Sequence, residues 1–123
     1  MFFHPWHDET SYTRLLNEES VKEVNIDNNG KKAHGWLKIN NQDEVSPLVI
    51  MFLGNAENTS NTMSYFIDSN KFNYYSNYNV LMVDYPGYGL SEGTSSDKTM
   101  FELSEKIYDY AYNLENVYFF PFG

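Results

Sequence analysis

The sequence contains no cysteine, which excludes disulfides, thiolate metal sites and a cysteine nucleophile. Basic residues are few: 8 Lys and Arg stand against 17 Asp and Glu, giving a formal charge of −9. Nucleic acids and anionic membranes need clustered basic side chains, so the charge predicts that neither is a partner. No window reaches the roughly 20 apolar residues of a membrane span, and the apolar opening is too short for a secretory signal. These absences predict a soluble, cytoplasmic protein.

Aromatic residues, by contrast, are abundant. The chain is 41% hydrophobic and 18% aromatic, with 11 Tyr and 9 Phe among its 123 residues. This composition excludes a disordered acidic tail. The length fits one domain with a buried core of its own.

Two apolar runs organise the chain. Residues 48–53 read Leu-Val-Ile-Met-Phe-Leu, and residues 80–83 read Val-Leu-Met-Val. Runs that do not alternate with polar residues are typical of strands covered on both faces in a parallel sheet. A helix is predicted between them over residues 60–75, with Ser60 or Asn61 as its N-cap. Together these segments predict a βαβ unit.

Periodicity and turn residues predict the other elements. Strands at residues 21–26 and 32–39 form a β-hairpin, because the Asp-Asn-Asn-Gly sequence between them tolerates positive φ. The clearest helical pattern covers residues 98–114, where Thr99 and Glu102 are expected to form a capping box. A further strand is expected at residues 117–120.

The ends of the two apolar runs carry a family resemblance. Residues 54–56 read Gly-Asn-Ala, and residues 84–93 read Asp-Tyr-Pro-Gly-Tyr-Gly-Leu-Ser-Glu-Gly. In order and spacing these motifs resemble the α/β-hydrolase superfamily, in particular small hydrolases whose third strand ends in His-Gly-Asn and whose fourth ends in Asp-Tyr-Arg-Gly-Tyr-Gly-x-Ser-x-Gly. Here Leu53 stands where that family has His, and Pro86 stands where it often has Arg.

The resemblance implies a partial α/β-hydrolase sheet, with an N-terminal antiparallel hairpin followed by three parallel strands and crossover helices. Residues 1–20 would be an N-terminal lead-in, irregular or helical. Residues 21–123 would be the N-terminal half of the core, ending at or just before the nucleophile elbow. The implied strand order is the hairpin, then the fourth, third and fifth strands.

The same resemblance assigns roles to the two strand ends. It implies that backbone N–H groups of Asn55 and Ala56 form an oxyanion hole, which needs donors fixed in advance where charge develops. It also implies that a second set of residues is structural and shapes the turns: Gly54, Asp84, Gly87, Gly89 and Gly93.

On this alignment the chain contains no catalytic residue. The nucleophile of the family sits on a turn directly after the fifth strand, and the acid and His follow it. Residues 89–93 do fit Gly-x-Ser-x-Gly, but four turn residues separate this motif from its strand. A Ser also needs a base within reach, and no His occurs after His34. We therefore expect that Ser91 is not a nucleophile.

Two further groups of residues are candidates for ligand sites. A terminal cluster could be interpreted as a metal site, but a terminal segment with Pro and Trp is a poor rigid scaffold; its members are His4, His7, Asp8 and Glu9. The turn glycines lack the dinucleotide-binding spacing. We predict no metal and no cofactor, and we expect His34 to be a packed core or interface residue.

The sequence and the resemblance together leave three candidate functions. The first is a fragment of a serine hydrolase that cleaves an ester, amide or thioester, with a small acyl substrate bound only by the complete enzyme, so that the chain alone is inactive. The second is a noncatalytic, hydrolase-derived module that binds a partner or itself. Self-association is expected because an aromatic strand at residues 117–120 would be an exposed sheet edge. The other expected partner is a complementing C-terminal half. The third is a flavodoxin-like small-molecule binder.

Overall fold

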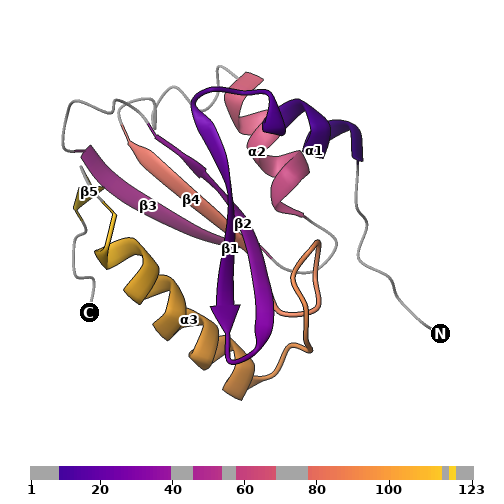
Figure 1. The fold of residues 1–123 in the computed structure, drawn as a ribbon, viewed down its shortest axis with the longest axis vertical. Coiled ribbons are helices and arrows are strands. Elements are labelled where there is room, and N and C mark those ends of the chain that lie inside the picture. Colours follow the sequence, from indigo (N-terminus) through magenta and orange to yellow (C-terminus); the bar gives the residue numbers. More distant parts are fainter. Residues whose placement is uncertain (1–8, 40–45, 54–57, 69–77, 115–116, 119–123) are drawn as a thin grey trace.

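A computed structural model describes residues 9–39, 46–53, 58–68, 78–114 and 117–118, and the structural statements below concern these residues. Eight elements follow one another along the chain (Figure 1): α1 (Glu9–Leu16), β1 (Val21–Asn28), β2 (Lys31–Lys38), β3 (Ser46–Leu53), α2 (Thr59–Asp68), β4 (Asn79–Asp84), α3 (Asp97–Tyr112) and β5 (Val117–Tyr118). No helix in these ranges is long and apolar enough to cross a membrane.

The strands form one mixed sheet in the order β1-β2-β4-β3-β5. β1 and β2 form an antiparallel hairpin, and β2 also runs antiparallel to β4, whereas β4, β3 and β5 are parallel to one another. This arrangement confirms the predicted fold class and the predicted strand order. The flavodoxin-like alternative is wrong, because that fold has a parallel sheet in which the first strand is not part of an antiparallel hairpin.

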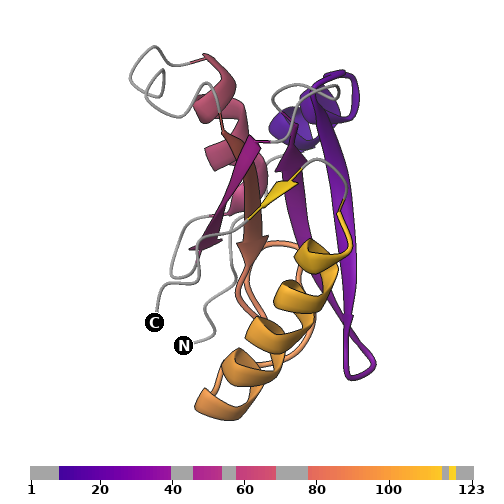
Figure 2. The ribbon, with the colours of Figure 1, turned by 90° about the vertical axis from the view of Figure 1, so that its left-hand side faces the viewer.

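Alternate residues of the sheet face different helices, as the period of two in a strand requires. One apolar cluster joins the sheet to α3 and is centred on Leu81, Val83, Leu103 and Ile107. The other joins the opposite face to α1 and α2, and it contains Leu15, Val21, Trp36, Met63, Phe66, Val80 and Met82. Figure 2 shows the sheet between these two helical layers. β4 is therefore buried along its whole length, as its unbroken apolar sequence predicted.

Most of the β3 side chains are only half-buried. The apolar run in β3 led us to expect cover on both faces, yet Val49, Ile50, Met51 and Phe52 are all partly exposed in the structure. β4 pairs with one edge of β3 along residues 48–53, and the described part of β5 pairs with the other edge at Ser46 and Pro47. Residues 119–120 of the predicted fifth strand lie outside the described residues.

The start of α3 corrects the predicted capping box. The N-cap is Ser96, whose hydroxyl accepts a hydrogen bond from the Thr99 N–H at 3.1 Å. The Ser96 N–H in turn donates to the Thr99 hydroxyl at 2.9 Å, so Thr99 is the second member of the box and not its first. The prediction was wrong because a Thr at the third helical position can accept the returning bond that we assigned to Glu102.

Two further helix and turn expectations have different outcomes. The cap of α2 is Asn58, whose side chain accepts a hydrogen bond from the Asn61 N–H at 2.9 Å, so the assignment to Ser60 or Asn61 was wrong. Residues 69–75 of that predicted helix lie outside the described residues. The hairpin turn is confirmed, with positive φ at Asn29 and Gly30.

Arg14 connects the two helices on one face of the sheet. Its guanidinium donates to the Ser64 hydroxyl at 2.7 Å and to the Ser64 carbonyl at 3.0 Å. It also forms an ion pair with Asp68 at 2.7 Å. These contacts hold α1, which belongs to the predicted lead-in, against α2.

Gly35 lets β2 approach β4 closely. A Cβ atom at this position would collide with the backbone carbonyl of Met82 in β4. Glycine is required here because the two strands lie too close together for a side chain. The backbone conformation does not require it, since Gly35 has no positive φ.

We therefore predict that Gly35→Ala lowers the free energy of unfolding by about 2 kcal/mol or more, since the strands must separate to admit a methyl group. Gly30→Ala is the matched control: its added methyl meets open space, and only the backbone conformation is strained, at a cost of about 1 kcal/mol. Urea unfolding of both variants measures the difference. Equal losses would contradict the steric explanation.

Candidate functional site

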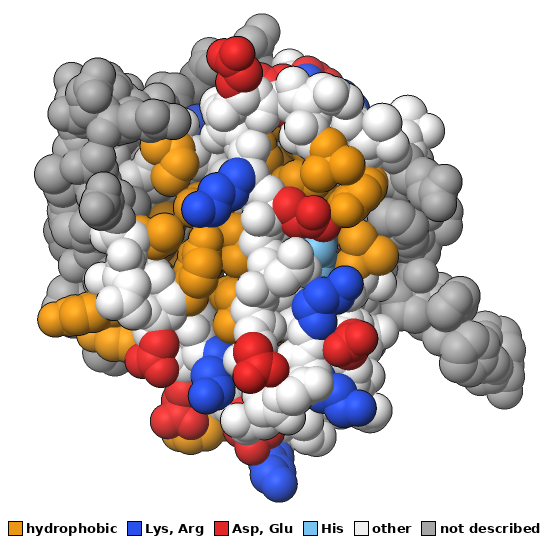
Figure 3. All heavy atoms as spheres, viewed as in Figure 1, with side chains coloured by type: hydrophobic (Ala, Val, Ile, Leu, Met, Phe, Trp, Pro, Cys, Tyr) orange, Lys and Arg blue, Asp and Glu red, His pale blue; other side chains and the backbone are white. Residues whose placement is uncertain are grey.

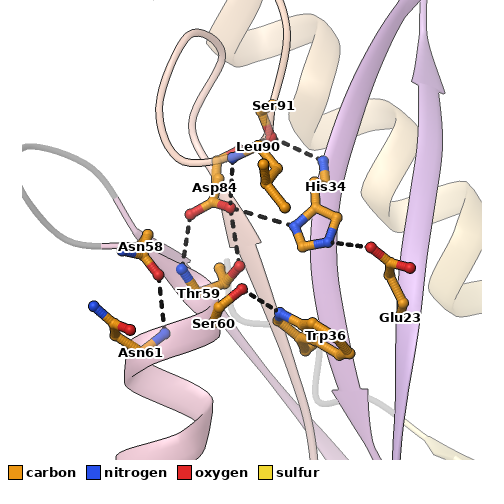
Figure 4. Close-up of polar contacts among 10 residues, drawn as sticks. All are labelled: Glu23, His34, Trp36, Asn58, Thr59, Ser60, Asn61, Asp84, Leu90 and Ser91. Carbon is orange, nitrogen blue, oxygen red and sulfur yellow. Dashed lines mark hydrogen bonds and ion pairs between the residues drawn. The ribbon is translucent and has the colours of Figure 1, made fainter. Parts of the chain in front are cut away.

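A polar cluster continues the α1/α2 face of the sheet where its apolar cluster ends. Its members are Glu23 in β1, His34 in β2 and Asp84 in β4 (Figure 4). Because side chains alternate along a strand, each shares a face with the apolar residue two positions away, namely Val21, Trp36 and Met82. The residue types change from apolar to ionisable along a single continuous face.

Asp84 is the centre of this cluster. Its carboxylate is 1% exposed and accepts hydrogen bonds from the Thr59 N–H and the Thr59 hydroxyl, both at 2.9 Å. The Leu90 N–H lies 3.5 Å from the same carboxylate. Thr59 is the first residue of α2, where unpaired N–H groups and the helix dipole favour a negative charge. Asp84 therefore fastens the start of α2 to the end of β4.

This contact also bears on the connection between β3 and α2. Asp84 is the register partner of Leu53, the last residue of β3, and its carboxylate binds Thr59, the first residue of α2. The two ends of the connection are thus held by one residue. The expected oxyanion residues Asn55 and Ala56, with Gly54, lie between these ends and outside the described residues.

His34 lies at the middle of the cluster and has no exposed surface. Its Nε2 atom is 2.8 Å from Glu23 Oε2, and its Nδ1 atom is 3.5 Å from Asp84 Oδ2. The ring packs edge-on against Trp36, with centroids 5.5 Å apart. The prediction that His34 is a packed core residue is confirmed.

Ser91 is buried and makes its hydrogen bonds with backbone groups. Its hydroxyl accepts from the His34 N–H at 2.8 Å and donates to the Asp84 carbonyl at 2.9 Å. Ser91, His34 and Asp84 therefore lie together, but the hydroxyl proton is directed to a carbonyl and not to the imidazole. The arrangement differs from a catalytic triad, in which the ring accepts the serine proton.

The turn that follows β4 is fixed by glycines and by the hairpin. Gly87, Gly89 and Gly93 have φ values of 82°, 54° and 99°, which favour glycine. A Cβ atom on Gly89 would also collide with the Asp84 carboxylate. Glu92 accepts from the Lys32 N–H through its side chain and donates to the Lys32 carbonyl, each at 2.7 Å. The turn is therefore joined to β2.

Two helix residues complete the surroundings of the cluster. Hydrogen bonding to the Glu23 carboxylate, burial and the charge of Glu23 all raise the pKa of Tyr12 in α1 above its ordinary range. Trp36 Nε1 donates to the Ser60 hydroxyl in α2 at 3.0 Å. Both helices are therefore tied to this end of the sheet by polar as well as apolar contacts.

The remaining candidates are the predicted metal ligands and the basic side chains at the surface. Within the described ranges, no group of three or more His, Asp or Glu side chains is arranged to hold a metal ion. Of the terminal cluster, His4, His7 and Asp8 lie outside those ranges, and Glu9 is the first residue of α1. On the face shown in Figure 3, basic side chains are interspersed with acidic ones.

Sequence reasoning missed the connection between Glu23, His34 and Asp84, and also missed Thr59. A signal was present, because the hairpin register places His34 beside β1, and Asp84 is in phase with Val80 and Met82 along β4. Thr59 could not have been assigned, since the predicted cap positions for α2, Ser60 and Asn61, were two and three residues too late.

The chain is similar to known proteins in structure and not in sequence. The sequence matches no protein-family model, and no curated protein matches it. Solved structures do match. An α/β-hydrolase from Vibrio vulnificus superposes with a TM-score of 0.65 at 14% identity, over 90% of this chain and 38% of that one.

Two other similar structures are the esterase Pf2001 from Pyrococcus furiosus and the Cif epoxide hydrolase from Acinetobacter nosocomialis. The esterase has a TM-score of 0.52 at 19% identity, over 88% of this chain and 44% of its own. The epoxide hydrolase has a TM-score of 0.52 at 16% identity, over 90% and 35%. This chain has part of the α/β-hydrolase fold. It spans less than half the length of each of these hydrolases.

The central contact of this hydrolase-fold chain can be tested by one substitution. Asp84→Asn keeps the size of the side chain but removes its charge and places an amide group near donors, so we expect the free energy of unfolding to fall by about 2 kcal/mol. Asp109→Asn, on the exposed side of α3, is the control and should change it by less than about 0.5 kcal/mol. Denaturant unfolding compares the two; similar small effects would show that the Asp84 contacts contribute little.

Proposed function

We propose that this chain is the scaffold and oxyanion-loop portion of a serine hydrolase with the α/β-hydrolase fold. In the complete enzyme the reaction would be hydrolysis of an ester, amide or thioester. The backbone N–H groups of Asn55 and Ala56 would stabilise the oxyanion that forms when the acyl carbonyl is attacked. The chain alone is expected to be inactive, because it supplies neither nucleophile nor base.

The observation that carries this proposal is the fixing of both ends of the β3–α2 connection by Asp84. An oxyanion donor is effective only when it is held in place before charge develops, because reorganising it during the reaction costs free energy. Asp84 pairs with Leu53 in the sheet and binds the Thr59 N–H at the start of α2. A backbone connection anchored in this way suits the proposed role.

The geometry of Ser91 supports the expected lack of activity. A serine hydroxyl becomes nucleophilic when a base removes its proton. The Ser91 hydroxyl donates its hydrogen bond to the backbone carbonyl of Asp84, and a carbonyl is not a base that could remove the proton. The Ser91 side chain is also buried. The reacting serine of the proposed enzyme is therefore a different residue.

An ester assay tests the proposal directly. We expect no turnover of a short-chain nitrophenyl ester above the background rate, and no adduct with a fluorophosphonate probe in the mass spectrum of the intact protein. Ser91→Ala should give the same result as the unchanged chain. Turnover or labelling that disappears in Ser91→Ala would show that Ser91 is the nucleophile and that the proposal is wrong.

A second proposal is that the chain is a noncatalytic module that associates with itself through the edge of β3. The described part of β5 pairs with Ser46 and Pro47, and none of the described strands lies beside residues 48–53 on that edge. An apolar strand with a free edge favours pairing with another chain. A reading frame that continued past Gly123 into x-Ser-x-Gly would instead favour the first proposal.

Self-association can be measured by sedimentation at increasing protein concentration. We expect concentration-dependent dimers or larger species, and we expect Val49→Lys to reduce them at least severalfold, because a charge on an edge strand opposes pairing. Tyr112→Lys adds the same charge at an exposed position on α3 and should have no effect. A monomer at every concentration, or association lost only in the Tyr112 variant, would contradict pairing at β3.

A further inference from the structure

The surroundings of His34 place a carboxylate oxygen at each of its ring nitrogens. Glu23 Oε2 is 2.8 Å from Nε2, and Asp84 Oδ2 is 3.5 Å from Nδ1. A neutral imidazole carries one N–H and one lone pair, whereas an ionised carboxylate can only accept. In either neutral tautomer, one nitrogen lone pair would therefore face a carboxylate oxygen.

Because His34 is buried, water cannot come between the nitrogen lone pair and the carboxylate oxygen. The His34 side chain is inaccessible, and Nδ1 makes no hydrogen bond in the structure although Asp84 lies within ion-pair range. A buried polar atom without a partner costs free energy, and repulsion between lone pairs would add to that cost. Protonation of both nitrogens replaces the repulsion by an attraction to a charge on each side.

Among the described residues, the groups that face His34 come from β1, β4, α1 and the turn after β4. Glu23 lies on the β1 side and Asp84 on the β4 side, and the α1 contribution is the Tyr12 ring, whose centroid is 6.2 Å from that of His34. Tyr12 also interacts with Glu23. The turn contributes the uncharged Ser91, which binds the His34 backbone. No basic side chain among these neighbours opposes a positive charge on the ring.

We propose that His34 is a positioning residue: it carries two ring protons, and this imidazolium holds the Asp84 carboxylate in place against the start of α2. The Asp84 oxygen that faces Nδ1 is also the oxygen that accepts from the Thr59 hydroxyl. His34 thus acts on Thr59 through Asp84. A role of this contact in catalysis rests on the proposed oxyanion role of the β3–α2 connection. The two ring protons of His34 and its hold on Asp84 do not depend on that role.

The proposal makes the start of α2 dependent on the charges around His34. With two protons on the ring, the side chains of Glu23, His34 and Asp84 carry a net charge of minus one, and the ring attracts Asp84. With a neutral ring, no positive charge would lie between the two carboxylates, and the position of Asp84 would be less restricted. Glu23→Gln removes one of the two negative charges that stabilise the imidazolium, so this variant should loosen the contact between Asp84 and Thr59.

Nuclear magnetic resonance of the ¹⁵N-labelled chain tests this. We expect both His34 ring nitrogens to show the shifts of protonated nitrogens at neutral pH. In Glu23→Gln the ring should lose this signature under the same conditions, and the Thr59 amide should exchange with solvent about tenfold faster. Glu105→Gln, which removes an exposed charge on α3, should change neither.

A single neutral tautomer in the unchanged chain at neutral pH would overturn the proposal. An unchanged exchange rate of the Thr59 amide in a Glu23→Gln variant whose ring has lost the doubly protonated signature would overturn it too. If that variant does not fold, the spectrum of the unchanged chain still decides whether His34 carries two ring protons. None of these measurements involves turnover. The inference about His34 can therefore fail while the proposed hydrolase role stands, and the hydrolase role can fail while the inference stands.

Discussion

One buried carboxylate, that of Asp84, joins three parts of the molecule that are distant in the sequence. It ends β4, it binds the first residue of α2, and it occupies the space left by Gly89 in the turn. A charge removed from water must be compensated by hydrogen bonds or by opposite charges. The local structure around Asp84 can be understood as that compensation.

The same constraint explains why polar residues gather at this end of the sheet. Along the α1/α2 face, β1, β2 and β4 first supply apolar side chains to the helices and then supply Glu23, His34 and Asp84. The apolar part of this face anchors the helices mainly by packing, with one hydrogen bond from Trp36 to Ser60. The polar part fixes their positions through bonds of defined length, and this is the end from which the β3–α2 connection departs.

Much of the fold could be predicted from the sequence because it depends on local patterns. The apolar runs in β3 and β4, the Asn-Asn-Gly turn of the hairpin and the periodicity of α3 each identify an element. The two strand-end motifs supplied the strand order. Helix starts were less predictable, because Ser96 and Asn58 compete with several neighbouring residues that can also cap, and only the packed structure decides between them.

The candidate site was predictable only in part. Asp84 and the glycines of its turn were assigned a structural role from the resemblance alone, but the partner of Asp84 is a residue 25 positions away, and no local pattern indicates it. His34 and Glu23 are only 11 positions apart, and the hairpin register brings them together, so their contact could have been predicted. The contact between Asp84 and Thr59 could not, because it depends on how α2 packs on the sheet.

The most direct test is a double-mutant cycle between Asp84→Asn and Thr59→Val, in which Val keeps the shape of the buried Thr59 side chain and removes its hydroxyl. Urea unfolding of the four proteins gives the coupling free energy between the two side chains. If the Asp84 carboxylate fastens α2 to β4, the two substitutions should be coupled by about 1 kcal/mol or more. Losses that add to within about 0.3 kcal/mol would contradict the account, because they would show that the two residues contribute to stability independently.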